Sequence, residues 1–429
     1  MNIKNDNNGN NDNKDSEESQ PALEEKNVPE KYRHRSLINQ KYLFEKKIGS
    51  GSFGSVYKGK NVISDEPVAI KFEAVTTNIP TLLWESKILN HLAGTQGVVK
   101  LRYFGTEANK NIIVMDLFSH TLYEEINQLK VSQTKEPSNS TEVEMGSEHD
   151  THPTYSSPQS SIEHNMSGND SDTGVSKTIH IASTTVVSTE MESLKPIIKP
   201  HILSVVKYLI SMIEIIERVH EAGVVHRDIK PENFMISERS ERSDRSEGGV
   251  GGGGANIEKR LHIIDFGLSR FYMKGDKHVS KTSKTVSNTD TNTDTNTNTN
   301  TNTNTNTNTN NNMVGTIRYM SMNIHKNEIY TRRDDIISIM YVAIYFARGN
   351  LPWSGLIPEK GDKRQKDELV YEKKIKITSM ELCENIPRVF QKLLDYSYSL
   401  KFEDKPDYVY MIRQCKNFLK LYIYKYSRA

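Results

Sequence analysis

The chain has 429 residues, and its 56 lysines and arginines almost balance its 55 aspartates and glutamates, for a formal net charge of +1. This balance excludes a strong overall field that would draw the protein to nucleic acid or to an anionic membrane, so we expect neither as a direct partner. No run of ~18 apolar residues could span a bilayer, and the N-terminus lacks the apolar core of a signal peptide, which predicts a soluble intracellular protein without a membrane anchor.

Ordered structure is expected from about residue 37, because residues 1–36 are rich in polar and charged side chains and predict a disordered tail. The first motif is glycine-rich and reads Ile48-Gly49-Ser50-Gly51-Ser52-Phe53-Gly54-Ser55-Val56. Such a loop brings backbone amides against phosphate oxygens. Dinucleotide-binding folds share G-x-G-x-x-G but continue into a helix, whereas V-Y-K-G-K predicts a returning strand here.

The next strand, Val68-Ala69-Ile70-Lys71, ends in a lysine. By composition alone this is an ordinary edge strand. Because it follows the glycine motif so closely, we expect Lys71 to contact nucleotide phosphates and Ala69 to line the nucleotide pocket. Glu85 opens a helical pattern and is placed to pair with Lys71; the alternative is a solvated helix acid.

Two further strands follow, and the second, N-I-I-V-M-D-L-F, is expected to run into a hinge. There Met115 and Leu117 would border the adenine pocket, with the backbone of residues 116–118 facing the base. From about 131 to 200 the pattern dissolves into polar residues, which predicts an insertion before the first helix of a larger lobe. The apolar face of that helix is Ile202, Val205, Val206, Leu209, Ile213 and Ile216.

The helix leads to His226-Arg-Asp-Ile-Lys-Pro-Glu-Asn233. In this pattern Asp228 would accept the proton of an attacking hydroxyl, Lys230 would neutralise charge on a transferred phosphate, and Asn233 would hold magnesium. A charged and Gly-rich insertion at about 238–259 interrupts two short strands, and Asp265-Phe266-Gly267 follows them. Asp265 is the expected second magnesium ligand.

These motifs occur in the order typical of protein kinases with ATP and Mg²⁺ as cofactors. We therefore expect an α+β, bilobal protein kinase fold with a small β-rich N-lobe (about 37–118) and a larger, mainly helical C-lobe (about 119–425). The low-complexity insertions would be disordered.

A third insertion, at about 274–312, contains a long Thr-Asn repeat without apolar residues. Regulatory phosphorylation of its threonines is one interpretation. A repeat expansion tolerated in an exposed loop is simpler, since long surface insertions cost little free energy. Aggregation of an Asn-rich tract is a third alternative.

In most protein kinases the activation segment, which follows the D-F-G motif, ends with A-P-E. This chain has Gly315-Thr-Ile-Arg-Tyr-Met-Ser-Met-Asn-Ile-His325 at that place. The stretch resembles the casein kinase 1 family, whose members carry G-T-A-R-Y-A-S-I-N-x-H at this point. Other stretches agree: R-R-D-D at 332–335, L-P-W-S-G-L at 351–356, K-R-Q-K at 363–366 and F-E-D-K-P-D-Y at 402–408. The likeness covers about residues 42–424, apart from the three insertions.

The resemblance implies a monomeric Ser/Thr kinase that is active without phosphorylation of its activation segment and prefers acidic or already phosphorylated substrates. The family binds the priming phosphate through basic residues, and the matching positions here are Arg318, Gly355 and Lys366. The alternative for Arg318 and Lys366 is that they are ordinary solvent-exposed charges without a binding role. The family often has a lysine just before G-T, where this chain has Asn311 or Asn312, which implies weaker anion binding.

The stretch from Asp335, D-I-I-S-I-M-Y-V-A-I-Y-F, is apolar on nearly every face and predicts a buried helix. In the family pattern this aspartate bonds to the backbone of the catalytic loop; the alternative, a helix N-cap, is compatible with that role. Family members often carry a long C-terminal tail that restrains activity. This chain ends soon after the pattern, so we expect little autoinhibition.

A catalytically weak kinase-fold scaffold is a competing hypothesis, but such proteins typically lose Lys71, Asp228 or Asp265, and all three are present. A lipid or small-molecule kinase is disfavoured by the match around Arg318. The two cysteines, Cys383 and Cys415, lack metal-site spacing and predict free thiols in a reducing compartment. Because K-R-Q-K can serve nuclear import, we expect the protein in the cytoplasm, the nucleus or both.

Overall fold

The structure of the protein, a computed structural model, describes residues 36–51, 54–77, 81–134, 201–240, 257–280, 313–356 and 363–426. The expected tail over 1–36, apart from its last residue, most of the three expected insertions and the Thr-Asn repeat lie outside the described residues. Within the described ranges, no helix has the length and apolar character needed to cross a lipid bilayer.

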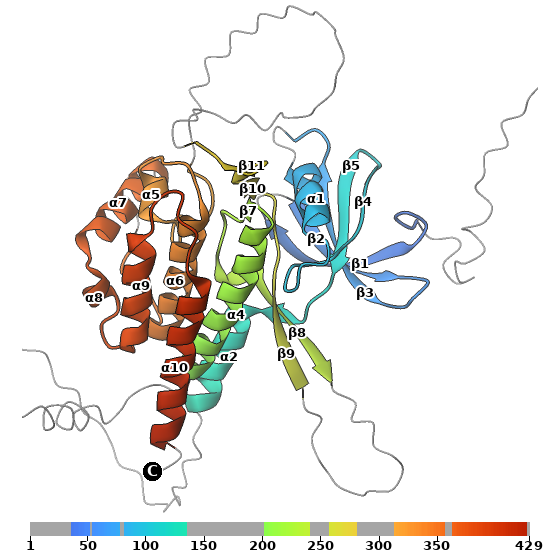
Figure 1. Ribbon diagram of the computed structural model, residues 1–429. Coiled ribbons are helices and arrows are strands. Elements are labelled where there is room, and N and C mark those ends of the chain that lie inside the picture. The colour runs from blue at the N-terminus through green and yellow to red at the C-terminus, as the bar shows by residue number, and fades with distance from the viewer. Residues whose placement is uncertain are drawn as a thin grey trace, which may run out of the picture. The chain divides into compact units, whose positions relative to one another are not determined.

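The N-terminal part of the described chain is an antiparallel sheet of five strands in the order β1-β2-β3-β5-β4 (Figure 1). The strands are β1 (Tyr42–Gly51), β2 (Gly54–Asn61), β3 (Pro67–Ala74), β4 (Leu101–Glu107) and β5 (Lys110–Asp116). Strands β3 and β5 have near-continuous runs of buried side chains, as expected for inner strands. The buried cluster on this sheet consists of Ile38, Tyr42, Val68, Ile70, Ile112 and Val114.

Helix α1 (Thr81–His91) packs against β3, β4 and β5. Its first turn is capped from the sheet by the buried carboxylate of Glu73, which accepts hydrogen bonds from the Thr81 backbone (2.8 Å), the Thr81 hydroxyl (2.7 Å) and the Leu82 backbone (3.2 Å). A helix start otherwise leaves such N–H groups unsatisfied. This cap fixes the helix that carries Glu85.

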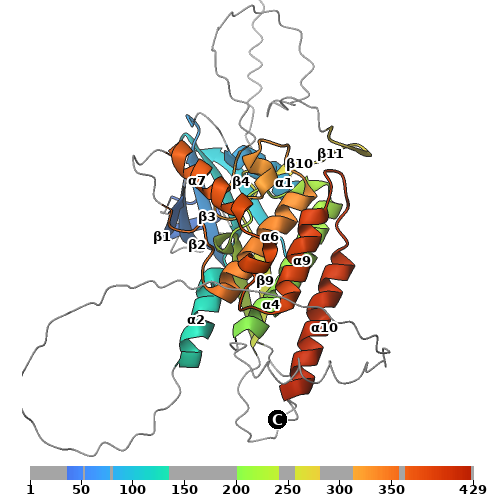
Figure 2. The same ribbon diagram turned by 90° about the vertical axis from the view of Figure 1, so that its left-hand side faces the viewer.

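The C-terminal part is mainly helical, and four of its helices, α4, α6, α9 and α10, lie side by side (Figures 1 and 2). The helices of this part are α2 (Leu122–Thr134), α4 (His201–Glu221), α5 (Met322–His325), α6 (Arg332–Arg348), α7 (Lys363–Lys376), α8 (Ser379–Leu382), α9 (Arg388–Ser399) and α10 (Tyr408–Tyr426). The sheet-rich N-terminal part and this helical part confirm the α+β prediction. Both cysteines are free, as predicted, and burial raises the pKa of each thiol to about 12.

The predicted helices before and after the expected catalytic loop (residues 226–233) are confirmed. All six apolar positions expected on one face of α4 are buried. Helix α6 is buried at nearly every position, as its sequence indicated. It begins after Thr331, whose backbone N–H donates to Asp334 (2.8 Å), and it ends at Gly349, whose φ of 94° favours glycine. The capping carboxylate is therefore that of Asp334, which leaves Asp335 for another contact.

Short strands flank residues 226–233. They are β6 (His120–Thr121), β8 (Phe234–Ser240) and β9 (Ile257–Ile263) in one sheet, β7 (Val224–Val225) with β10 (Arg270–Phe271), and β11 (Met273–Lys274) with β12 (Lys277–His278). The end of β9 meets the loop after α1, where the Ile263 N–H donates to the Gly97 carbonyl (2.7 Å). This bond ties the strand that precedes Asp265 to the N-terminal part of the chain.

One helix contradicts the expected order of elements. The first insertion was expected between the hinge and the first helix of the larger lobe, but α2 lies in between and runs to Thr134. Its apolar residues Leu122 and Ile126 are buried one turn apart. A reciprocal capping bond also starts it, because the Thr121 N–H donates to Glu124 (2.7 Å) and the Glu124 N–H to the Thr121 hydroxyl (3.1 Å).

Two other insertions are shorter than expected. Strands β8 and β9 continue to the pair Ser240 and Ile257, and opposite charges face each other across them, as in Glu238 and Lys259. In the activation segment, β11 and β12 form a hairpin with Gly275 at a φ of 59°. Both polar segments pair through their backbones, which their composition did not indicate.

Replacing the α1 cap should destabilise the protein. We expect Glu73→Leu to lower the free energy of unfolding by about 2 kcal/mol, because buried donors at the start of α1 lose their acceptor. Urea denaturation measures this change. Glu45, an exposed glutamate of β1, is the matched control, and Glu45→Leu should change the free energy by less than about 0.5 kcal/mol. Equal losses in the two variants would contradict the capping role.

Candidate active site

The glycine motif lies where β1 turns back into β2. Ile48, Gly49, Ser50 and Gly51 end β1, and Gly54, Ser55 and Val56 begin β2. Ser52 and Phe53, at the tip, lie outside the described residues. Gly54 has a φ of 130°, and a Cβ there would lie 1.9 Å from the Phe72 carbonyl oxygen, so only glycine allows this approach of β2 to β3.

The sheet register aligns the glycine motif with Lys71. Gly49 pairs with Val56, Val56 with Lys71, and Lys71 with Ile113. Residues directly opposite on neighbouring antiparallel strands present their side chains on one face. The Val56 and Lys71 side chains therefore share a face of the sheet beside the Gly49 backbone.

Two residues before Lys71 on β3, Ala69 pairs with Met115 on β5, and both side chains are buried. Leu117 follows the end of β5 and is half-buried. The neighbouring hinge side chains are engaged elsewhere: Asp116 accepts a hydrogen bond from Arg102 Nε (2.6 Å), and the Phe118 ring stacks on His262 with centroids 4.5 Å apart. The expected adenine-facing residues thus lie at one end of the sheet, beside the row that contains Lys71.

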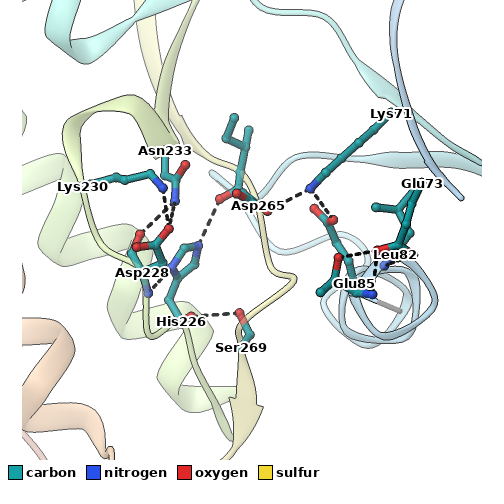
Figure 3. Close-up of polar contacts among 12 residues, drawn as sticks. Lys71, Glu73, Leu82, Glu85, His226, Asp228, Lys230, Asn233, Asp265 and Ser269 are labelled. Atoms are coloured by element: carbon teal, nitrogen blue, oxygen red, sulfur yellow. Dashed lines mark hydrogen bonds and ion pairs between the residues drawn. The ribbon is translucent and has the colours of Figure 1, made fainter. Parts of the chain in front are cut away.

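Lys71 joins three elements (Figure 3). Its Nζ donates to Glu85 Oε2 on α1 (2.7 Å) and to Asp265 Oδ1 after β9 (2.9 Å). Burial favours the neutral amine, but the two carboxylates outweigh it and raise the Lys71 pKa above its usual value. Burial alone would raise the pKa of Asp265, but the neighbouring Lys71 ammonium outweighs burial and lowers this pKa below its usual value. The predicted pairing of Lys71 with Glu85 is confirmed.

The Asp265 backbone has a φ of 65°, a left-handed conformation that few non-glycine residues adopt. Its neighbours hold it on both sides. The Ile264 N–H donates to the Asn233 carbonyl (2.9 Å), and the Phe266 ring is buried edge-to-face against His226, with centroids 4.8 Å apart. Surrounding contacts therefore fix the strained residue.

Asp228 is buried and receives three side-chain hydrogen bonds. Lys230 Nζ (2.5 Å) and Asn233 Nδ2 (3.2 Å) donate to Oδ2, and the Thr316 hydroxyl donates to Oδ1 (2.8 Å). Thr316 follows Gly315, which has a φ of 100° and where a Cβ would meet the Arg227 carbonyl at 2.4 Å. The structure thus brings the three predicted catalytic residues together and adds Thr316.

Asp335 fixes the backbone of the catalytic loop, as predicted. It accepts hydrogen bonds from the N–H groups of His226 (2.8 Å) and Arg227 (3.0 Å), and from the Tyr330 hydroxyl (2.8 Å). His220 Nε2 lies 2.9 Å from Asp335 Oδ2, the oxygen that also accepts from the His226 N–H. Burial opposes ionisation of Asp335, but these hydrogen bonds hold its pKa below the usual value.

Asn233 and Asp265 fit a shared magnesium ion. The Asn233 side chain donates to the Asp228 carbonyl through its nitrogen (2.8 Å), which leaves the amide oxygen as a possible ligand. In the described part of the chain, no three His, Cys, Asp or Glu side chains gather in a metal-binding cluster. Magnesium usually takes one or two protein ligands and completes its shell with phosphate oxygens and water, and this donor set suits that mode.

Arg318 lies in the segment that follows Thr316. Its guanidinium is 5.9 Å from the Tyr319 ring centroid and 6.0 Å from that of Tyr345, and its carbonyl accepts a hydrogen bond from Trp353 Nε1 (2.7 Å). Gly355, with a φ of 75°, and Lys366 of α7 are both exposed. Among the described residues, no hydrogen bond or ion pair links Arg318 with Lys366, so their joint role stays a prediction.

Three residues of the site were not singled out from the sequence: Thr316, His220 and Trp353. Thr316 and Trp353 lie inside the stretches on which the casein kinase 1 resemblance rests, so their context was visible although their roles were not. His220 sits at the end of α4, where it reads as one more polar residue of an amphipathic helix.

A His220→Asn variant should make the protein less sensitive to acid. Burial lowers the His220 pKa, so the folded protein binds a proton at this ring less readily than the unfolded chain, which takes one up below about pH 6.5. The contribution of His220 to the free energy of unfolding is therefore fully present above about pH 6.5. It falls as the pH is lowered, by at most ~1.4 kcal/mol per pH unit.

Urea denaturation at about pH 7 and about pH 5 measures the effect. We expect the wild type to lose more stability between these conditions than His220→Asn does. The control, His91→Asn, changes an exposed histidine and should lose as much as the wild type. An equal loss in His220→Asn and wild type would contradict the lowered pKa of His220.

Two models of known families match the chain. A model described as protein kinase domain matches residues 176–414, and one described as protein tyrosine and serine/threonine kinase matches residues 42–290. The matched ranges include the glycine motif, Lys71, the catalytic loop and Asp265. Since each match covers more than half of the chain, this protein belongs to the protein kinase family.

Proposed function

We propose that this protein kinase is a serine/threonine kinase of the casein kinase 1 type, which transfers the ATP γ-phosphate to acidic or pre-phosphorylated protein substrates. One observation carries the proposal: Asp228 lies in contact with Lys230, Asn233 and the Thr316 hydroxyl. The Thr316 contact shows that an aliphatic hydroxyl reaches the carboxylate at hydrogen-bonding distance, as a serine or threonine substrate must.

In this mechanism Asp228 orients the substrate hydroxyl and accepts its proton. The hydroxyl oxygen forms a bond to the γ-phosphorus while the bond to the bridging oxygen of ADP breaks. Lys230, which lies 2.5 Å from Asp228, neutralises charge on the transferred group. Lys71, held by Glu85, positions the α- and β-phosphates beneath the glycine motif from Ile48 to Val56.

Protein kinase domains generally use ATP with Mg²⁺. A bound magnesium ion would offset the negative charge of the phosphates. In this chain Asn233 and Asp265 would hold it. Ala69, Met115 and Leu117 would enclose the adenine at the end of the sheet.

Substrate preference is proposed from the resemblance and from the position of Arg318. Its backbone is anchored by Trp353, and its guanidinium lies close to the ring of Tyr319 in the same segment and to the ring of Tyr345 on α6. A phosphate bound there would meet a positioned cation. Gly355 and Lys366 complete the proposed anion site. We further propose a monomer that acts in the cytoplasm, the nucleus or both.

Asp228→Asn should abolish most phosphate transfer. The asparagine keeps the shape of the side chain but not the base, so we expect kcat for a serine peptide to fall by ~10²–10⁴-fold, with little change in nucleotide affinity. The control, Asp276→Asn, changes an exposed residue of the β11–β12 turn and should retain wild-type activity. If the wild type binds ATP but transfers no phosphate to protein, a catalytically weak scaffold replaces the proposal.

Arg318→Ala should remove a preference for primed substrates. Two peptides are compared, one with phosphoserine three residues before the target serine and one with serine at that position. The loss of charge-assisted hydrogen bonds should lower kcat/KM about 10- to 100-fold for the primed peptide and far less for the other. The control is Lys326→Ala, an exposed cation of the same region. Equal losses on both peptides would contradict a phosphate site at Arg318.

A further inference from the structure

Lys374 is a buried lysine on a polar helix. Its side chain is almost inaccessible to solvent, while its neighbours Lys373, Ile375 and Lys376 on α7 are exposed. Burying an amine is costly unless hydrogen bonds replace its contacts with water. The mechanism described above gives Lys374 no part, so its burial needs a different explanation.

Within the described part of the chain, every hydrogen-bonding contact of Lys374 is made with the segment that contains Arg318 or with the helix that follows it. Its Nζ donates to the carbonyl oxygens of Ile317 (2.8 Å) and Met320 (2.6 Å) and lies 3.2 Å from His325 Nε2. The rings of Tyr341 and Trp353 lie 5.3 and 5.2 Å away and enclose the amine. Three partners match the three donors of a lysine ammonium.

The same contacts survive loss of the proton. Burial lowers the Lys374 pKa well below its usual value, and a neutral amine still has two N–H donors for the two carbonyls. Its lone pair can then accept from a protonated Nε2 of neutral His325. Burial, together with Lys374, lowers the His325 pKa to about 3, which keeps a second cation away from the amine. The hydrogen bonds that Lys374 supplies therefore do not depend on its charge.

The two carbonyls lie on either side of Arg318 and Tyr319. Between them, the Arg318 carbonyl accepts from Trp353 Nε1 (2.7 Å). At the upstream end of the segment, the Thr316 hydroxyl bonds to Asp228. At the downstream end, the Ser321 hydroxyl and the Asn323 amide donate to Asp334. Lys374 and Trp353 thus fasten the middle of a segment whose first residue touches the catalytic aspartate.

We propose that Lys374 is a positioning residue for the protein substrate: it fixes the backbone of Ile317–Met320, so that Arg318 and the surface beside Asp228 are formed before a substrate arrives. The residue itself touches no substrate. The inference rests on the proposed function, because it assigns this segment to substrate binding. Removing the contacts should loosen the segment and weaken substrate binding, and it should leave the nucleotide site on the N-terminal sheet unchanged.

The test compares Lys374→Met, which keeps the length of the side chain but has no donor, with Lys374→Gln, which has a neutral donor. Lys373→Met is the matched control, because that neighbouring lysine is exposed. For each full-length variant, KM is measured for a primed peptide and for ATP, with the rate of ATP hydrolysis without peptide. Hydrogen exchange is followed over residues 313–320.

We expect the peptide KM of Lys374→Met to rise about tenfold or more, while its ATP KM and its peptide-independent hydrolysis stay within about twofold of the wild type. Lys374→Gln should lie between this variant and the wild type, Lys373→Met should match the wild type, and exchange over 313–320 should be faster in Lys374→Met. An unchanged peptide KM, or an ATP KM that rises in parallel with it, overturns the proposal.

Two further outcomes are separable. If Lys374→Met does not fold, Lys374→Gln decides the question by the same two constants, and a peptide KM equal to that of the wild type overturns the proposal. If the wild type phosphorylates no peptide, the proposed function fails. The positioning role then stands or falls on hydrogen exchange, and unchanged exchange over 313–320 in the folded Lys374 variants overturns it.

Discussion

The nucleotide side of this kinase depends on one ammonium group that two carboxylates share. Lys71 comes from the sheet, Glu85 from α1 and Asp265 from the turn after β9, and the bonds of 2.7 and 2.9 Å form only when all three elements are in place. Removing one partner would leave buried charge uncompensated, which costs several kcal/mol. The supporting contacts serve this junction: Glu73 starts the helix that carries Glu85, and the bond between Ile263 and Gly97 ties down the strand before Asp265.

The substrate side is organised around Asp228 in a different way. Here the anchors are main-chain groups, because Asp335 binds the N–H groups of His226 and Arg227 while Trp353 and Lys374 bind carbonyls of the segment after Thr316. Side chains on the larger lobe therefore hold backbone in place, and the residues displayed from that backbone are free to meet ligand. Such anchors restrict the geometry of the site without restricting its chemistry.

The sequence predicted what local patterns encode. Spacing and periodicity alone predicted the strand that returns after the glycine motif, the V-A-I-K strand and the apolar face of α4. The Asp335 contact with the loop backbone was predicted from the family pattern. What it missed depends on partners far along the chain. Lys374 lies in K-R-Q-K-D-E-L-V-Y-E-K-K-I-K, a polar helix in which nothing distinguishes the buried lysine from its exposed neighbours. Helix α2 and the paired ends of β8 and β9 were missed because polar composition masked a capping bond and cross-strand pairs.

The paired ends of β8 and β9 also bear on how the chain tolerates changes in length. Ser240 and Ile257 are opposite each other in the ladder, so the chain leaves and re-enters the fold at neighbouring points. Each doubling of a loop closed in this way costs only about 0.6 kcal/mol. The strands beneath lead from Asn233 and toward Asp265, and their register continues without a break to this pair. We therefore expect that a reporter domain or an affinity tag inserted between Ser240 and Ile257 leaves the spacing of Asn233 and Asp265 intact, which makes this position a suitable one for labelling the protein.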